Sequence, residues 1–417
     1  MADFDKISIN GTYYNVKDSA LTAAVNALTS EVGEVQETVN QQGQTIQQQG
    51  QTIQQQGQAI ANLSTQLGKL SKLPTVKDYG AVGDGSADDT EAIKQALSEA
   101  GCAIIPPGTY KISSSINLSN NQDIFGFGPK ASKIITTGNF DAIVATGCIN
   151  STIFGIGIDG RNTTNTGIRV SNSASVACVL CEVTKCKGHG IRYEGKYDAV
   201  SPTHKIFGCF CALNGLDGYS LNATDCTMDC CSGVSNGQAN PDNCFNLAVF
   251  MAAKITNCHF FNVNDKFGYK RCGSSVSLNG PDIQVSCCHI EGGKNNCLTI
   301  GSNAVRLLMS NCLIYASFGD SLVWCGNWGI HFSNVTFLGQ ASDDVSKPAF
   351  VQTLAGNPQD LWIDNCYFSD VVSTGGLGNS LIIAVCSKDF GTAFPAISKA
   401  SCRGYVKCNG TFTDLGA

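Results

Sequence analysis

The sequence predicts a fibrous, mostly β-stranded chain in which a parallel β-solenoid follows a coiled coil. Glycine is abundant, with 45 of 417 residues, whereas only 14% of the residues are charged, and this composition suits a β-rich fold with many turns. Residues 21–70 repeat apolar side chains in heptads, which indicates a coiled coil. From about residue 150 onward, a short apolar motif recurs every 22 to 31 residues, which indicates a solenoid.

Residues 19–73 are predicted to form the coiled coil. One core position recurs every seven residues and holds Val25, Val32, Val39, Ile46, Ile53, Ile60 and Leu67. The other core position holds Leu21, Leu28, Val35, Gln42, Gln49, Gln56, Leu63 and Leu70. A low-complexity disordered linker is the alternative, but disorder would not keep isoleucine in register across the glutamine-rich repeats. The unbroken heptads predict a left-handed supercoil of two or three chains, weakest at Gly43, Gly50 and Gly57.

Residues 1–18 carry the signal of a β-hairpin. Two short alternating runs, residues 6–10 and 13–17, flank Asn10-Gly11. Asn-Gly between such runs favours a two-residue turn. The place of this hairpin ahead of a fibrous segment predicts a docking element, with a disordered leader as the alternative.

Residues 74–112 are predicted to open the β-solenoid. Three glycines within residues 80–85 lie where a turning chain needs residues that adopt positive φ. Asp88 and Glu91 have the spacing of a capping box at the start of a helix. The buried face of this helix is expected on Ile93, Ala96, Leu97 and Ala100. A strand containing P-P-G-T-Y follows the helix.

The remaining residues, 113–417, are predicted to form the body of the β-solenoid. The motif reads apolar, any, usually Asn or Gly, Cys or another apolar residue, any, apolar, as in Ile255-Thr-Asn-Cys258-His-Phe260. Apolar residues three apart and then two apart do not fit one straight strand, so a bend separates two short strands. Residues that tolerate the left-handed conformation occupy the bend: Gly155, Gly208, Asn257, Asn311, Asn334 and Asn365. A further set of strands is expected at residues 190–193, 218–221, 297–300 and 380–383.

Most of the 22 cysteines are interpreted as small apolar residues that fill the solenoid core in the reduced state. The fourth motif position forms an internal ladder, with one residue per coil at roughly 4.8 Å spacing. The ladder contains Cys181, Cys209, Cys231, Cys258, Cys288, Cys312 and Cys366. Cys178 and Cys181 have a zinc-like spacing, yet no second C-x-x-C pair follows at a suitable distance. The sequence therefore predicts no metal site and no cofactor.

Composition and patterning argue against several classes of protein. The net charge of −6 gives no reason to expect a nucleic-acid partner. The first residues, M-A-D-F-D-K, have neither the basic start nor the apolar core of a secretory signal. No apolar run approaches the roughly 20 residues of a spanning helix, so membrane insertion is not expected. Synthesis in a cytoplasm is expected.

The run D-Y-G-A-V-G-D-G…D-D-T-E-A-I…P-P-G-T-Y, within residues 75–112, resembles the opening of pectate-lyase-like (rhamnogalacturonase/epimerase-like) right-handed β-helix proteins. This superfamily includes many bacteriophage tail spikes. The resemblance implies an all-β, right-handed parallel β-helix whose open end is covered by the helix, with Asp84, Asp88 and Asp89 in structural roles. It also implies a homotrimer in which the heptad segment is a trimeric coiled coil and residues 1–18 dock to the phage tail or baseplate. The protein would be a virion component, made in the host cytoplasm.

The same resemblance implies that the outer face of the β-helix binds or cleaves a bacterial surface polysaccharide. In the strand after each bend, the outward positions lie one and three residues past the ladder residue. Three successive coils place His259, Phe261, His289, Glu291 and Tyr315 at these positions, in a chain with only five histidines. Sugar sites combine carboxylates for acid–base chemistry with aromatic rings for apolar sugar faces. The alternative is a solvated face with polar residues by chance.

We assign Glu291 and His289 to the centre of the candidate catalytic site, with His259 assisting. Phe261 and Tyr315 are interpreted as sugar-facing rings. One carboxylate beside imidazoles suits an elimination by proton abstraction at least as well as a hydrolysis.

Other side chains are weaker candidates. Hydrolysis would require a second acid roughly 5 to 9.5 Å away, for which Asp265 and Asp320 are candidates. Trp324 and Trp328 are interpreted either as sugar platforms or as anchors in the core or an interface.

Two functions from different classes remain. The first is a tail-spike enzyme, a depolymerase that cuts a surface polysaccharide by hydrolysis or elimination. The second is a non-catalytic receptor-binding fibre that uses the same β-helix surface. A free polysaccharide lyase or pectinase-like glycoside hydrolase is disfavoured, because the sequence has a coiled-coil arm and no secretory signal. The sequence leaves open whether the site lies within one subunit or between subunits.

Overall fold

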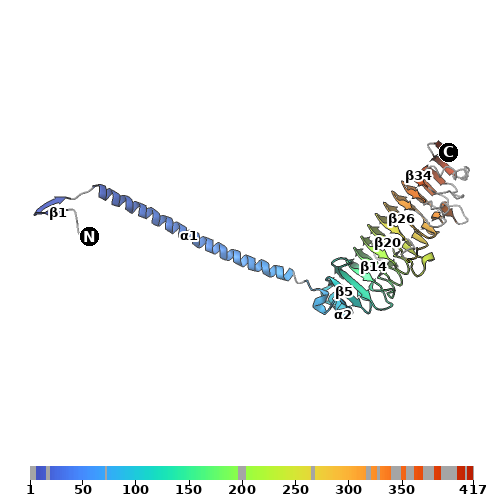
Figure 1. Cartoon of the computed structure of the whole chain (residues 1–417), viewed down its shortest axis with the longest axis horizontal. Helices are drawn as coiled ribbons and strands as arrows, with labels where there is room; N and C mark the ends of the chain where they lie inside the picture. Colours follow the sequence, from blue (N-terminus) through green and yellow to red (C-terminus); the bar gives the residue numbers. More distant parts are fainter. Residues whose placement is uncertain are drawn as a thin grey trace. The chain divides into compact units, whose positions relative to one another are not determined.

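The computed structural model of the chain divides into two units, Met1–Leu73 and Pro74–Ala417, each described by itself (Figure 1). The structure describes residues 6–15, 19–70, 73–195, 203–263, 268–315, 321–325, 329–339, 349–353, 361–369, 380–386, 402–408 and 411–416. Within these ranges, no helix combines the length and the apolar composition that crossing a membrane requires.

The first unit begins with the predicted β-hairpin. β1 (Lys6–Ile9) and β2 (Thr12–Asn15) pair antiparallel. Asn10 and Gly11 connect them with φ angles of 51° and 82°, so both turn residues adopt the left-handed conformation that matches the twist of a hairpin. The hairpin around Asn10-Gly11 is confirmed, and residues 16–18 lie outside the described part.

The first unit continues as one helix, α1 (Ser19–Leu70), of 52 residues. Its heptad side chains are exposed: Val25 is 56% exposed, Ile46 67% and Leu63 64%. An exposed heptad stripe on one long helix is typical of helices that form coiled coils. The predicted helix is confirmed, and its assembly into a trimeric coiled coil stays a prediction.

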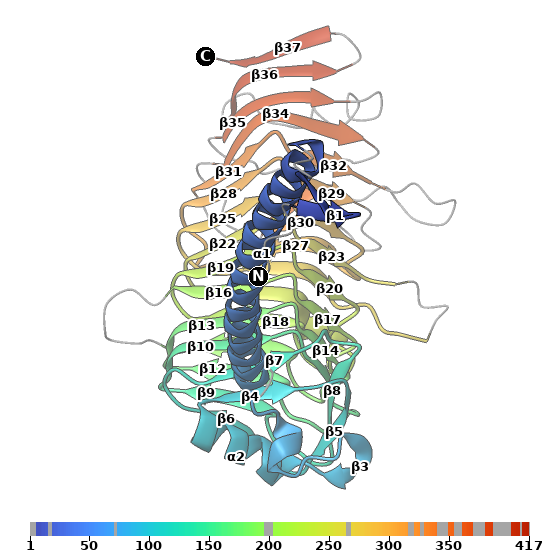
Figure 2. The same cartoon turned by 90° about the vertical axis from the view of Figure 1, so that its left-hand side faces the viewer.

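The second unit opens with the 3-10 helix η1 (Val76–Tyr79), strand β3 (Asp84–Asp88) and helix α2 (Thr90–Ala100). α2 buries Ile93, Ala96 and Leu97 of its predicted apolar face, whereas Ala100 at the end of the helix is exposed. The helix packs against strands of the first coil at one end of the stack (Figure 2). This position agrees with the covering role that the family resemblance implies.

The predicted capping box of Asp88 and Glu91 is wrong. Strand β3 continues to Asp88 because it pairs with a strand of the first coil, and the helix therefore begins two residues later. The N-cap residue is Asp89, whose carboxylate accepts hydrogen bonds from the backbone N–H groups of Val82 and Gly83 (2.6 and 3.2 Å). Long-range pairing thus overrides the local helix-start signal.

The other acidic side chains of this segment also bind nearby turns. A capping box occurs at η1, where Asp78 accepts a hydrogen bond from the backbone N–H of Thr75 (2.7 Å). Asp84 accepts two backbone N–H groups of the following turn (2.7 and 2.8 Å), and Asp88 accepts the N–H of the first helical residue (3.1 Å). These contacts agree with a structural role for the acidic cluster.

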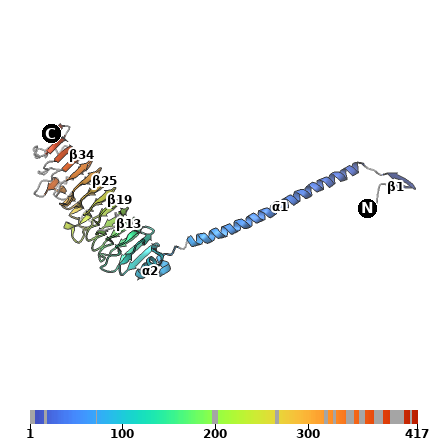
Figure 3. The same cartoon turned by 180° about the vertical axis from the view of Figure 1, so that it is seen from behind.

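Each coil of the second unit contains three strands separated by turns (Figures 1 and 3). In one coil they are β13 (Ala174–Val179), β14 (Glu182–Thr184) and β15 (Ile191–Glu194). Each pairs in parallel with the corresponding strand of the next coil, so the coils stack as three columns of strands. Alternate side chains of every strand point inward and form the core. The predicted parallel β-solenoid is confirmed.

Within each of the three columns, the strands of successive coils follow one another in chain order (Figure 2). The first column is β4 (Cys102–Ile105), β7 (Asp123–Gly126), β10 (Ile149–Phe154), β13, β16 (His204–Phe207), β19 (Cys226–Asp229), β22 (Ala253–Thr256), β25 (Ile283–Ser286), β28 (Leu307–Ser310) and β31 (Ile330–Ser333). The second column is β5 (Gly108–Ile112), β8 (Ser132–Thr136), β11 (Gly157–Asp159), β14, β17 (Phe210–Ala212), β20 (Ser232–Val234), β23 (His259–Phe261), β26 (His289–Glu291), β29 (Leu313–Tyr315) and β32 (Thr336–Leu338). The third column is β6 (Ile116–Leu118), β9 (Ile143–Thr146), β12 (Ile168–Ser171), β15, β18 (Tyr219–Asn222), β21 (Phe245–Val249), β24 (Ser274–Leu278), β27 (Asn296–Ile300), β30 (Ser321–Cys325) and β33 (Ala349–Thr353). A short 3-10 helix, η2 (Pro241–Asn243), precedes β21.

The turn between the first two columns is the predicted bend. Its third motif residue has a φ between 47° and 64° in every copy of the motif, including the copies that carry Leu or Cys there. Asparagine amides connect successive bends: the side chain of Asn334 donates to Oδ1 of Asn311 (2.6 Å), and that of Asn365 donates to Oδ1 of Asn334 (3.1 Å). Asparagine therefore both tolerates the left-handed conformation and ties one coil to the next.

The predicted cysteine ladder lies in the core. Its seven thiols are 1–3% exposed. The backbone N–H of one ladder residue donates to the thiol of the next coil, for example from Cys258 to Sγ of Cys288 (3.5 Å). Every cysteine whose side chain the structure describes is free, and Cys230 and Cys287 are exposed. The burial of the ladder is confirmed, and the reduced state of its thiols stays a prediction.

The last described strands depart from the three-column pattern. β34 (Leu361–Ser369) runs through the bend and pairs with strands of both the first and the second column. β35 (Ser380–Cys386) then pairs along β34, so the prediction that residues 380–383 continue the further set of strands is wrong. The other three strands of that set are confirmed in the third column. β36 (Cys402–Cys408) and β37 (Thr411–Gly416) pair antiparallel.

Candidate functional site

The five candidate residues of the second column lie together on its outer face. In β23, β26 and β29 the middle residue is buried and its two neighbours point outward, because side chains alternate along a strand. The register places His259 beside His289 and Glu291 beside Tyr315. We call His259, His289 and Glu291 the His–Glu cluster.

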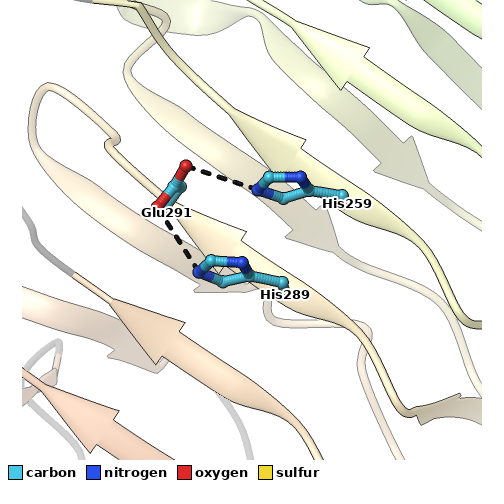
Figure 4. Close-up of side chains that lie close together, drawn as sticks. All are labelled: His259, His289 and Glu291. Atoms are coloured by element: carbon cyan, nitrogen blue, oxygen red, sulfur yellow. Dashed lines mark hydrogen bonds and ion pairs between the residues drawn. The ribbon is translucent and has the colours of Figure 1, made fainter.

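The carboxylate of Glu291 lies at the Nε2 edges of the two imidazoles and contacts both of them (Figure 4). Its Oε1 is 3.3 Å from Nε2 of His259, and its Oε2 is 3.4 Å from Nε2 of His289. The two imidazole rings are stacked, with centroids 4.5 Å apart and planes 3° apart. Parallel pairing of successive coils produces this stack, because identical side chains at paired positions repeat at the strand spacing of roughly 4.8 Å.

Two further aromatic rings flank the stacked imidazoles. Phe261 stacks on His259, with centroids 4.5 Å apart and planes 27° apart. The ring of Tyr315 lies 6.4 Å from that of His289 on the other side. The structure therefore brings together all five residues that the sequence assigned to the patch.

The His–Glu cluster is half-buried. The side chains of His259, His289 and Glu291 are 39%, 34% and 24% exposed, so solvent and solutes reach them. Burial lowers the pKa of His289, and the nearby Glu291 charge partly opposes this shift. Nε2 of His289 is enclosed and makes no hydrogen bond within the described part of the chain, and the Glu291 carboxylate 3.4 Å away is its polar neighbour.

A shallow groove of about 520 Å³ runs beside the cluster, on the side of the bends. It is lined by His259, His289, Leu313, Thr336, Cys287 and the bend asparagines 257, 311 and 334, among others. Amide and imidazole groups can bind sugar hydroxyls, and the groove is large enough for a small ligand. In chemical terms, the site offers one carboxylate and two imidazoles for proton transfer.

Of the other predicted residues, Trp324 is the one that lies in the described part of the chain. Trp324 belongs to β30 in the third column, where it pairs with Thr299 and Gln352. Trp328, Asp265 and Asp320 lie outside the described residues. The strand that carries Trp324 is therefore not part of the patch.

A second groove, which the sequence reasoning missed, lies on coils nearer to α2. It has a volume of about 520 Å³ and is lined mostly by apolar side chains, including Phe127, Phe154, Leu180 and Phe210. We call it the phenylalanine groove. Phe127 is 64% exposed. The repeated Ile-Phe-Gly at residues 124–126, 153–155 and 206–208 marks this region in the sequence, and of its three phenylalanines Phe154 lines the groove.

The phenylalanine groove also contains charged groups at its edge. Glu182 lines it and forms an ion pair with Lys130, with Oε1 2.6 Å from Nζ. A second missed pair is His189 and Asp217, with Nδ1 3.3 Å from Oδ2, at the turn between the second and third columns.

A metal ion is the remaining chemical possibility for the His–Glu cluster. One ligand atom from each of its three residues lies within 4.8 Å of the others. The sequence analysis grouped these three residues in one patch but interpreted them as acid–base groups, and it predicted no metal site.

Residues 75–167 match the sequence model of the family described as "Rhamnogalacturonase A/epimerase, pectate lyase-like". The pre-neck appendage protein of Bacillus phage B103 is 44% identical over 54 residues, or 13% of this chain and 6% of that protein. The pre-neck appendage protein of Bacillus phage phi29 is 28% identical over 139 residues, or 28% of this chain and 16% of that protein. The matches thus span a small part of these curated relatives.

Among solved structures, the pre-mature bacteriophage phi29 gene product 12 is similar in fold, with a TM-score of 0.61. Its sequence is 14% identical, and the superposition covers 86% of this chain and 60% of that one. Residues 75–167 therefore resemble pectate lyase-like proteins in sequence, the chain shares its β-helix fold with phi29 gene product 12, and the curated sequence relatives are phage pre-neck appendage proteins.

Proposed function

We propose that this protein is a phage tail-spike subunit that binds and depolymerises a bacterial surface polysaccharide. The observation that carries the proposal is the Glu291 carboxylate, which lies within 3.4 Å of two imidazole nitrogens on the outer face of a pectate lyase-like β-helix. The curated relatives are named as pre-neck appendage proteins of Bacillus phages, and this supports a place in the virion.

The proposed subunit assembles as a parallel homotrimer through α1. The exposed heptad stripe of α1 supports this assembly, because such a stripe is typical of helices that form coiled coils. The N-terminal hairpin would dock to the phage tail or baseplate. The β-helix is proposed to be right-handed, because parallel strand crossovers take this hand in about 98% of cases.

The proposed reaction is an elimination on a uronic-acid sugar. A base removes the proton from the sugar carbon next to the carboxyl group, and the electron pair forms a carbon–carbon double bond. The bond to the glycosidic oxygen breaks, and this oxygen leaves with a proton from a second group. Glu291 and His289 supply the base and the acid, with His259 assisting.

Hydrolysis would need a second carboxylate roughly 5 to 9.5 Å from Glu291. The candidates for that role, Asp265 and Asp320, lie outside the described residues. The described residues offer one carboxylate beside two imidazoles, and this set suits an elimination. The two reactions give different products, because only elimination leaves a double bond that absorbs ultraviolet light.

The phenylalanine groove extends the proposed binding surface along the same column. β14, which carries Glu182, and β23, which carries His259, are three coils apart, or roughly 14 Å at the spacing of paired strands. Exposed aromatic rings such as Phe127 bind the apolar faces of sugars. A polysaccharide running along the column would reach both grooves.

A receptor-binding fibre without enzymatic activity is the second candidate function. The open phenylalanine groove favours it, because ring stacking binds sugars without acid–base chemistry. In this case the His–Glu cluster would bind glycan hydroxyls and break no bond.

The test is incubation of the full-length protein with capsule or exopolysaccharide from candidate hosts, followed by size-exclusion chromatography and ultraviolet absorbance. Depolymerisation would shorten the chains, and Glu291→Gln should slow this by at least about 100-fold while binding persists, since an amide still binds hydroxyls. Glu91→Gln changes an exposed carboxylate on α2 and serves as the matched control.

The outcomes separate the candidates. Binding without shortening by the unchanged protein would support the receptor-binding fibre and overturn the depolymerase. Undiminished cutting by a Glu291→Gln, His289→Ala double variant would place the catalytic site elsewhere.

A further inference from the structure

We propose that His259, His289 and Glu291 form a binding site for a divalent transition-metal ion, of which Zn²⁺ is the representative. The ligands would be Nε2 of each imidazole and one carboxylate oxygen. The metal site stands on geometry and ligand chemistry alone, and it does not depend on what the protein does to a polysaccharide.

The distances within the cluster fit such an ion. Zn²⁺ lies about 2.0–2.2 Å from nitrogen and oxygen ligands, so two ligand atoms of a tetrahedral site are roughly 3.4 Å apart. Nε2 of His259 is 3.3 Å from one oxygen of Glu291, and Nε2 of His289 is 3.4 Å from the other. All three ligand groups lie within 4.8 Å of one another, so small side-chain rotations would close the site.

The site is also organised in advance. The two imidazoles belong to paired positions of adjacent strands and are stacked at 4.5 Å, so the β-helix itself sets their separation. Phe261 stacks on the outer face of the His259 ring and restricts its rotation. Binding an ion therefore costs little side-chain entropy.

Nε2 of His289 gives an independent indication of a ligand. This nitrogen is enclosed and has no hydrogen-bond partner in the described structure. Buried polar atoms of proteins are normally hydrogen-bonded, whereas this nitrogen has only the contact with the Glu291 carboxylate at 3.4 Å among the described residues. A metal ion between the imidazoles and the carboxylate would give this lone pair a partner.

The ligand types favour some ions over others. Imidazole nitrogens suit Zn²⁺, Cu²⁺, Ni²⁺ and iron, whereas Ca²⁺ and Mg²⁺ prefer sites made only of oxygen ligands. Two imidazoles and one carboxylate, as in catalytic zinc sites, leave at least one coordination position open. Here the open position would be accessible, because the three side chains are 24–39% exposed.

The ion would compete with the proposed reaction. A metal takes the lone pairs of Glu291 and the two imidazoles that would otherwise transfer protons. The metal-loaded protein is therefore expected to bind polysaccharide but to cut it more slowly, and this consequence alone rests on the proposed function.

Metal binding is tested without any polysaccharide. The full-length protein is freed of metal with a chelator and titrated with Zn²⁺ by calorimetry and with Co²⁺ by absorption spectroscopy. The expected result is one ion per chain, with cobalt bands of nitrogen and oxygen ligands and without the intense near-ultraviolet band of thiolate ligands.

Three substitutions identify the ligands. His259→Ala, His289→Ala and Glu291→Gln should each weaken Zn²⁺ binding by at least about 100-fold, because each removes or weakens a direct ligand. His331→Ala removes an imidazole of another strand and should leave the affinity unchanged. Cys287→Ser removes the exposed thiol that lines the groove and should likewise leave it unchanged.

Circular dichroism of each variant shows whether its β-helix is intact. Two results would overturn the proposal. One is that the unchanged protein binds Zn²⁺ no more tightly than the three ligand variants do. The other is that Cys287→Ser abolishes binding while the ligand variants retain it. Absence of Zn²⁺ binding would not contradict the depolymerase proposal, and absence of polysaccharide cutting would not contradict the metal site.

Discussion

The helical arm and the β-helix both repeat an apolar pattern, but they bury it in different places. On α1 the core-position residues Val25 and Ile53 are 56% and 67% exposed, whereas Ile153 and Phe260 of the β-helix are 0% and 1% exposed. Each coil of the β-helix rests on the next coil of the same chain, whereas the exposed stripe of the arm is typical of helices that form coiled coils. A periodic apolar sequence thus gives a self-contained fold in one region and a signal for assembly in the other.

The largest expected effect is the loss of assembly when the arm is altered. In an Ile46→Asp, Ile53→Asp double variant, charges would have to enter the coiled-coil core, and burying unpaired charges is very costly. The mass measured by light scattering should fall from three chains to one, while circular dichroism of the β-helix is retained.

The matched control is Gln51→Asp, Gln58→Asp, which places the same charges on the outer face of the heptads. This control should remain trimeric. A mass of one chain for the unchanged protein would contradict the comparison between arm and β-helix.

Alkaline pH should destabilise the β-helix and spare the arm. Burial raises the pKa of Cys186, Cys226 and Cys272 to about 12, from the ordinary thiol value of 9.0. Between pH 9 and 12 the unfolded state loses protons that the folded state keeps, so the free energy of unfolding falls as the pH rises, by up to about 1.4 kcal/mol per pH unit for each thiol.

Residues 1–73 contain no cysteine, so the helical signal of the arm should lack this thiol-linked loss. Denaturant unfolding at pH 8, 9, 10 and 11, followed by a signal from each region, checks the prediction. Cys226→Ala should reduce the steepness of the loss in the β-helix. A β-helix whose stability is constant over this range would contradict the buried thiols.

A smaller effect is expected from a single core ring. Phe260→Ala should lower the free energy of unfolding by about 3–5 kcal/mol, because it leaves a cavity between coils. Phe127→Ala removes the same ring from a position that is 64% exposed and should change the stability by less than about 0.5 kcal/mol. Equal effects of the two substitutions in denaturant unfolding would show that the ring of Phe260 is not buried.

The repeated sequence motif predicts which side chains of the candidate site share the outer face. Because side chains alternate along a strand and coils stack in register, the outward positions of β23, β26 and β29 could be read from the motif, and the five patch residues were correctly grouped. The phenylalanine groove was missed because its rings come from the strand before the bend as well as the strand after it.

Local patterns in the sequence determined the β-hairpin, the long helix, the period of the coils, the bends and the buried cysteine ladder. In each case the deciding residues are neighbours in the chain: Asn10-Gly11 selects its own turn, and Asn257 or Gly155 adopts its left-handed conformation where it stands. Such signals need no knowledge of distant segments.

Only the tertiary structure decided features that depend on contacts between distant segments. Because β3 pairs with the first coil, α2 begins after Asp88. β34 continues through the bend, and β35 pairs with it and not with the third column. The Glu291 carboxylate contacts two imidazoles because stacking of coils brings His259 within 3.3 Å of it across 32 residues of sequence. Periodicity predicts which side chains share a face, but their rotamers, distances and enclosure follow from packing between coils.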